Sequence, residues 1–165
     1  MEDDFETACS EFQEAVSESP EYVEARFYLG ICQYRAGEIN QAEAHLRWVQ
    51  QRSPSPAVAR MLGIVQLAMG EAERARDTVR PLVQRDPDDA GAHALLARIE
   101  MRLGNTSQAV DHLQRAARLQ PDDPQMKLQL GAGLVQTGRV SAGRVALGEA
   151  TRGSIRNPVA QARCW

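Results

Sequence analysis

Apolar residues along this chain recur at helical spacing, in segments that each end at a glycine. Gly37, Gly70, Gly104 and Gly138 follow one another at intervals of 33, 34 and 34 residues. A leucine lies eight residues before each glycine, a small residue lies five residues after it, and an aliphatic residue follows four positions later. These spacings match a 3.6-residue period, so they predict amphipathic helices. A fixed period of this length is typical of stacked helical repeats.

Each repeat is predicted to be a pair of helices joined at its glycine. The small residues let the two backbones approach, the glycine turns the chain, and a proline ends the second helix in three repeats. We therefore expect one domain that contains the second helix of an incomplete repeat at 1–22, four repeats at 23–55, 56–89, 90–123 and 124–157, and the start of another at 158–165.

The aligned segments resemble the tetratricopeptide repeat (TPR), whose first helix carries a Leu-Gly pair and whose second helix carries Ala-x₃-Phe and then Pro. Leu29-Gly30 and Leu62-Gly63 match the pair, and Ala42 begins one second-helix match. The resemblance implies an all-α, right-handed α-solenoid of antiparallel helix pairs, a TPR superhelix with no β-sheet. Two aromatic positions of the family differ here: its tryptophan is replaced by Arg26, Ala59, His93 and Lys127, and its tyrosine by Gln33, Gln66, Glu100 and Leu134.

A narrower resemblance rests on sequence segments such as EARFYLGICQYRAGEINQAEAHL. It looks like the long TPR lipoproteins of bacterial exosortase/PEP-CTERM systems, which accompany exopolysaccharide production. That resemblance implies an envelope scaffold facing the periplasm, and a cytoplasmic location is the alternative without it. Neither end of the chain carries a polar capping repeat, so we expect a segment of a longer bacterial array; a natural short protein with degenerate end repeats is the alternative.

The charge distribution is uneven along the chain. Residues 1–22 hold eight acidic side chains and no Lys or Arg, whereas the rest of the chain holds 19 basic and 14 acidic side chains. From Arg139 onward there are five arginines and one acid. A solvated acidic helix face explains this pattern. The alternative is a homo-oligomer formed through the ends of the chain, whose apolar faces would lack neighbours.

Motifs for chemistry are not found in the sequence. The stretch from Gly133 to Val140 lacks the Lys and the Ser or Thr that a phosphate-binding loop needs. The three histidines are far apart in sequence and are expected on the surface. The three cysteines form no CxxC motif, so neither a disulfide framework nor a zinc site is expected, and Cys32 is expected to be a buried, inert thiol. We expect no catalytic residue, no metal and no cofactor.

The TPR resemblance implies that the first helices line a concave binding face. The lining positions are apolar with a subset of arginines, which suits a peptide that carries apolar anchors and carboxylates. The candidate residues are Phe27, Ile31, Tyr34, Arg35, Arg60, Ile64, Leu67, Arg98, Met101 and Arg102. The Lys/Asn clamp of chaperone-binding TPR proteins is missing. In the alternative, these apolar residues pack between repeats and the arginines only aid solubility.

These observations favour a non-enzymatic scaffold that binds a peptide or a partner protein. Nucleic acid fits less well, because aromatic residues make up 5% of the chain and Lys and Arg form no continuous stripe. No run of residues is apolar enough to span a membrane. Two alternatives stay open: a regulatory or substrate-presenting arm of an enzyme whose catalytic domain lies outside this chain, and a structural element that only self-associates.

Overall fold

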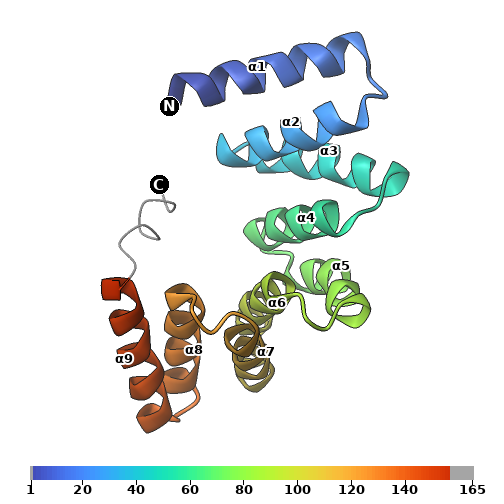
Figure 1. Ribbon diagram of the computed structural model, residues 1–165. Helices are drawn as coiled ribbons and strands as arrows, with labels where there is room; N and C mark the ends of the chain where they lie inside the picture. The colour runs from blue at the N-terminus through green and yellow to red at the C-terminus, as the bar shows by residue number, and fades with distance from the viewer. Residues whose placement is uncertain (1, 157–165) are drawn as a thin grey trace. The chain divides into compact units, whose positions relative to one another are not determined.

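Helices make up nearly all of the computed structural model, which describes residues 2–156, and their side chains over 5–151. Figure 1 shows their order: α1 (Glu2–Glu18), α2 (Val23–Arg35), α3 (Ile39–Arg52), α4 (Pro56–Ala68), α5 (Ala72–Arg85), α6 (Ala90–Arg102), α7 (Thr106–Leu119), α8 (Pro124–Gln136) and α9 (Val140–Arg156). Residues 2–156 contain no strand. The predicted all-α class is confirmed.

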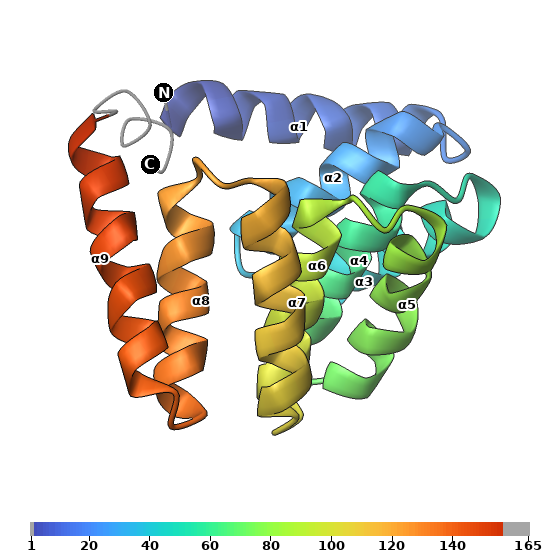
Figure 2. The same ribbon diagram turned by 60° about the horizontal axis from the view of Figure 1, so that its bottom comes forward.

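The chain divides into two compact units, Met1–Val79 and Arg80–Trp165, and the boundary falls inside α5. Within the first unit α2 packs against α3, and α1 packs against α2. Within the second unit α6 packs against α7 and α8 packs against α9, as antiparallel pairs joined by short turns (Figure 2). The second unit therefore contains the hairpins α6–α7 and α8–α9, and the first contains the hairpin α2–α3 with α1 packed against α2 and α4 against α3.

The turns inside the hairpins share one hydrogen-bonding pattern that requires glycine. Gly37 has a φ of 82°. Its N–H donates to the carbonyl of Tyr34 at 3.2 Å, and the N–H of Glu38 donates to the carbonyl of Gln33 at 2.8 Å. This pair of bonds is the Schellman motif, which satisfies the last carbonyls of a helix through a left-handed residue. The same geometry recurs at Gly70, Gly104 and Gly138.

Small residues allow the paired helices to approach closely. A Cβ atom built on Gly131 of α8 would lie 2.6 Å from Cγ of Leu147 in α9 and 3.1 Å from the carbonyl oxygen of Gly143. The equivalent positions in the preceding repeat hold Ala97 and Ala109, both buried. The α8–α9 pair therefore depends on glycine where the α6–α7 pair accepts alanine.

The cores are mainly aliphatic, and each hairpin contributes to them. In the first unit Ala42, Leu46, Leu62 and Val65 form one buried cluster. In the second unit the clusters are centred on Ala97, Ala109 and Leu113, and on Val110, Leu134 and Ala146. Because the apolar stripes of α2, α4, α6 and α8 are partly used in these cores, only the remaining side of each first helix can form the predicted binding face.

Candidate protein-interaction site

The first-helix stripe of the first unit begins on α2. Phe27, Ile31 and Tyr34 are four and three residues apart, so they lie on one face of the helix. All three are half-buried, and Phe27 and Tyr34 pack against the core cluster that contains Leu46. Arg35 is exposed, and its guanidinium carbon lies 4.9 Å from the ring centre of Phe5. This stripe combines apolar surface with one exposed positive charge.

The stripe continues on α4 with less exposed surface. Arg60 and Ile64 are half-buried, and Leu67 is only 8% exposed. A side chain as covered as Leu67 offers little surface to a ligand in this structure. The first helices of this unit thus contribute mainly partial apolar surfaces, and any ligand role of these residues stays a prediction.

On α6 of the second unit, two arginines flank a methionine. Arg98 and Arg102 are both exposed, and neither takes part in an ion pair among the described residues. Met101 is half-buried and packs against the cluster of Ala97, Ala109 and Leu113. The two guanidinium groups are four residues apart, so they lie on the same face of the helix, with part of Met101 beside them.

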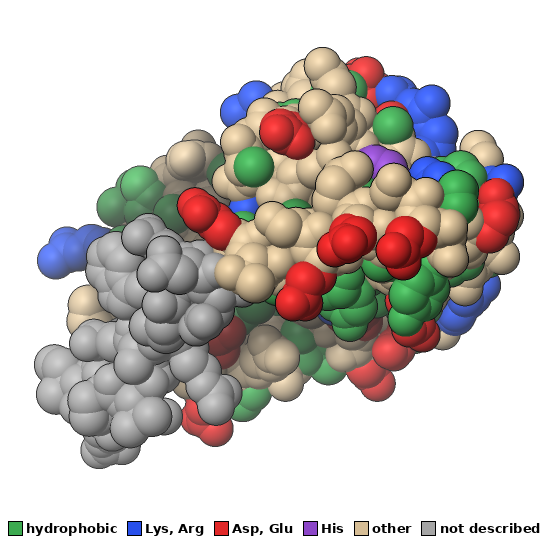
Figure 3. Space-filling view, turned by 90° about the horizontal axis from the view of Figure 1, so that it is seen from above, with side chains coloured by type: hydrophobic (Ala, Val, Ile, Leu, Met, Phe, Trp, Pro, Cys, Tyr) green, Lys and Arg blue, Asp and Glu red, His purple; other side chains and the backbone are tan. Residues whose placement is uncertain are grey.

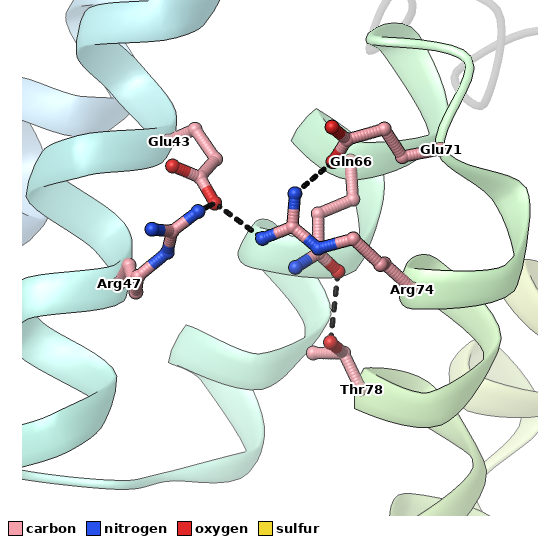
Figure 4. Close-up of polar contacts among 6 residues, drawn as sticks. All are labelled: Glu43, Arg47, Gln66, Glu71, Arg74 and Thr78. Carbon is pink, nitrogen blue, oxygen red and sulfur yellow. Dashed lines mark hydrogen bonds and ion pairs between the residues drawn. The ribbon is translucent and has the colours of Figure 1, made fainter.

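A polar network links the two repeats of the first unit (Figure 4). Glu43 of α3 is 6% exposed, and its carboxylate is paired with Arg47 on the same helix and with Arg74 of α5, at 3.0 Å for the latter. Arg74 also pairs with Glu71. A buried carboxylate needs such partners, because an unpaired charge in the interior is strongly disfavoured. These arginines therefore have a structural role and are not available to a ligand in the way that Arg98 and Arg102 are.

Two histidines that the sequence placed on the surface meet in the second unit. His93 of α6 is 9% exposed, and its Nδ1 lies 3.0 Å from Nδ1 of His112 in α7. The other ring nitrogen of His93 lies 3.0 Å from the carbonyl oxygen of Pro87, so we assign the proton of Nε2 to that bond. Burial lowers the pKa of His112, and the neighbouring His93 lowers it further, while Glu100 and Asp111 act in the opposite direction. The surface expectation is wrong for His93, which is a packed helix-pairing residue.

In the first unit, the positions equivalent to His93 and His112 are occupied by Arg26 and His45, which also lie close together. Nε of Arg26 donates to the carbonyl of Pro20 at 2.6 Å, and Nη1 lies 3.4 Å from Nδ1 of His45. Burial lowers the pKa of His45, and the charge of Arg26 adds to this effect. The guanidinium groups of Arg26 and Arg52 both lie over the ring of Trp48, at 4.3 and 3.9 Å from its centre. This polar pairing across the hairpin replaces the aromatic packing that TPR proteins have at the first position.

Cys9 of α1 and Cys32 of α2 form a disulfide, with their Cα atoms 5.6 Å apart. The expectation of an inert Cys32 thiol and no disulfide is therefore wrong. The second helix of one repeat packs against the first helix of the next, which brings together two cysteines separated by 23 positions in sequence. The repeat alignment placed the two cysteines on neighbouring helices, and that was the signal that could have indicated the pair.

Within the described part of the chain, no three His, Cys, Asp or Glu side chains are grouped so that they could hold a metal ion. None of the described helices has the length and apolar character needed to cross a membrane.

Comparisons with known proteins agree with this architecture. Two models of the tetratricopeptide repeat match the chain, one over residues 60–124 and 95–158 and the other over 1–62. Among solved structures, a MamA fragment from Desulfovibrio magneticus RS-1 is 18% identical with a TM-score of 0.82, and the match covers 92% of this chain and 86% of that one. TTC0263, a TPR protein of Thermus thermophilus, is 20% identical with a TM-score of 0.78, and the match covers 96% and 88%. None of the curated proteins compared with the chain matches it.

Proposed function

This chain belongs to the tetratricopeptide-repeat family, and from that premise we propose that it is a non-enzymatic scaffold that binds an acidic peptide or partner segment along its first helices. The TPR fold commonly mediates protein–protein interaction. In this proposal each unit offers its own stripe, with α2 and α4 in the first and α6 and α8 in the second. Solenoid repeats expose extended surfaces of this kind.

The observation that carries the proposal is the unpaired arginine pair on α6. Like charges at positions i and i+4 of a helix repel each other and destabilise it slightly. Arg98 and Arg102 have no carboxylate partner among the described residues to offset this. A ligand carboxylate would offset the repulsion, and arginine can bind it through two parallel hydrogen bonds. The partly exposed Met101 beside the pair would accept an apolar side chain of the same ligand.

A peptide selection tests this proposal. Random dodecapeptides displayed on phage are selected against the full chain, and the enriched sequences are synthesised and measured by fluorescence anisotropy. We expect acidic residues next to a leucine, methionine or aromatic residue, and a loss of affinity of about tenfold or more in Arg98→Ala/Arg102→Ala, the size expected for two charge-assisted hydrogen-bonded contacts.

The matched control removes two arginines from second helices of the same unit, Arg118→Ala/Arg144→Ala, both exposed in the structure. This variant has the same net charge as the test variant. It should bind the selected peptides as the unaltered chain does. Equal weakening in both variants, or no enriched sequence at all, would contradict binding at the α6 stripe.

The disulfide also supports a location outside the reducing cytosol. Disulfides persist in oxidising compartments such as the bacterial periplasm and are rare where glutathione and thioredoxin keep thiols reduced. We therefore propose that this chain works in the cell envelope. Thiol alkylation of the protein as extracted from its native cells should leave Cys9 and Cys32 unlabelled, whereas labelling of both would contradict this location.

A further inference from the structure

A groove in the first unit lies beside the disulfide, on the side of α2 away from the first-helix stripe. It has a volume of about 930 Å³ and is lined by α1, α2 and the start of α3. We call it the acidic groove and define it by Glu6, Glu14, Glu18, Cys32, Gln33 and Glu38. At about 100° per residue, the α2 residues Leu29 and Cys32, which line it, point away from Phe27. A ligand here would lie on the other side of α2 from Phe27, and only Arg35 of that stripe contacts a groove residue, Phe5.

The charge of the groove is of one sign. Four carboxylates line it, and no Lys, Arg or His side chain does. All four are exposed, and none forms an ion pair with another described residue. Acidic side chains gather over α1 in the view of Figure 3. Glu14 and Glu18 are four residues apart on one helix, where like charges repel.

The direction of α1 adds to this negative potential. The C-terminal end of a helix carries a partial negative charge and favours nearby cations. The last turn of α1 has no basic side chain and ends at Glu18. A cation at this end of the groove would therefore be attracted by the helix dipole and by the carboxylate together.

A second, independent feature in the wall of the groove is an amide that lacks one partner. Gln33 is 6% exposed; its Nε2 donates to Oε1 of Gln41 at 2.8 Å, while its own Oε1 has no hydrogen-bond donor among the described residues. A buried acceptor without a donor is costly. Gln33 lines the groove beside the exposed Gln41, so a ligand N–H group that enters between the two side chains would supply the missing donor to Oε1 of Gln33.

We propose that the acidic groove binds a lysine- or arginine-bearing segment of a partner protein. The lining of α1 runs from Phe5 to Glu18 and spans about 20 Å at the helical rise, which an extended segment of about six residues would follow. Its positive side chains pair with Glu6, Glu14 and Glu18, and one N–H donor reaches Oε1 of Gln33. The bond between Cys9 and Cys32 fixes α1 to α2 along the groove, so the site is formed before the ligand arrives.

The test uses the oxidised full chain and a fluorescein-labelled decapeptide of alternating lysine and glutamine, measured by anisotropy at about 50 mM NaCl, where screening of exposed charges is weak. Glu14→Gln/Glu18→Gln should weaken binding about fivefold, the loss expected for two exposed ion pairs. The control Glu11→Gln/Glu73→Gln removes two exposed acids of the same unit that do not line the groove, and should leave binding unchanged. A peptide of alternating glutamate and glutamine should not bind.

Gln33→Leu removes the unpaired acceptor without changing the charge, and should weaken the lysine peptide about tenfold. The equivalent position of the fourth repeat is Leu134, so leucine fits this place in the repeat, and circular dichroism checks that the variant is folded. Absence of binding to the unaltered chain, equal weakening by the two double variants, or full affinity in folded Gln33→Leu would overturn the proposal. Arg98→Ala/Arg102→Ala should bind the lysine peptide normally, so the two proposed sites succeed or fail separately.

Discussion

Opening the disulfide between Cys9 and Cys32 should destabilise the first unit by a predictable amount. In the chain-entropy account, a cross-link stabilises a protein by restricting the unfolded chain, and the effect grows with the length of the closed loop. The two cysteines are 23 positions apart. For a loop of that length the expected loss of free energy of unfolding is about 3.4 kcal/mol at 25 °C. This is large against the total stability of a small domain.

The assay uses a Cys164→Ser, Trp165→Phe background, which leaves one pair of cysteines and Trp48 as the only tryptophan. Trp48 lies in the first unit, where Arg26 and Arg52 cover its ring, so its fluorescence reports unfolding of that unit. Urea unfolding with and without reductant should differ by about 3 kcal/mol in this signal.

Counting thiols provides the decisive control for this prediction. In the same background, the denatured but unreduced protein should show no free thiol, and the reduced protein should show two. Two free thiols before reduction would show that the cross-link is not formed, and Trp48 unfolding curves that coincide with and without reductant would show that it does not stabilise the first unit.

Three further perturbations have expected outcomes. The pKa of His112 lies below its ordinary value of 6.5, so the unfolded chain binds more protons than the folded chain near and below that pH. The free energy of unfolding should therefore decrease as the pH falls below about 6.5. Urea unfolding at about pH 7.5 and about pH 5.5 should show this loss, and the loss should be smaller in His112→Gln. Glu43→Gln removes the charge that Arg74 and Arg47 share and should lower the free energy of unfolding by about 1 kcal/mol, since both guanidinium groups are nearly half exposed; an unchanged urea curve would contradict this. Gly131→Ala should lower the stability measured by thermal unfolding, because the added methyl group would overpack against α9. Overpacking costs about 1–3 kcal/mol, which outweighs a helix-propensity gain of about 1 kcal/mol. A more stable variant would show that α9 moves aside freely.

The fold was predictable because its requirements recur at fixed positions. Every turn inside a hairpin needs a residue with positive φ, and glycine marks all four of them. The close approach of paired helices needs small residues, which places Gly131 and Ala97 seven residues before a turn glycine. These are local constraints on one or two residues, so they are visible in the sequence.

The side-chain pairs were harder to predict, because they depend on which faces of neighbouring helices meet. His93 and His112 are separated by 19 residues, as are Arg26 and His45, so a recurring pair was present in the sequence. Only the packed hairpin shows that each pair bridges two helices. The disulfide depends on the contact between different repeats, which the spacing of cysteines within one repeat does not reveal.

The candidate arginines differ in the solvent exposure of their side chains, which the helical period of the sequence did not predict. Arg60 lies ten residues before the turn glycine of its repeat and is half-buried, whereas Arg98 lies six residues before its turn glycine and is exposed. The apolar candidates Phe27 and Met101 contribute to cores while keeping part of their surface exposed. A helical stripe in the sequence identifies the face, and the degree of burial is decided by the neighbouring helix.

Photo-crosslinking would show directly whether a ligand binds along the first helices. A peptide from the phage selection is synthesised with a benzophenone group beside its apolar anchor, irradiated with the full chain, and the adducts are located by mass spectrometry. We expect adducts on the first helices, above all on α6 near Met101. Adducts confined to the second helices α3, α5, α7 and α9 would contradict this expectation.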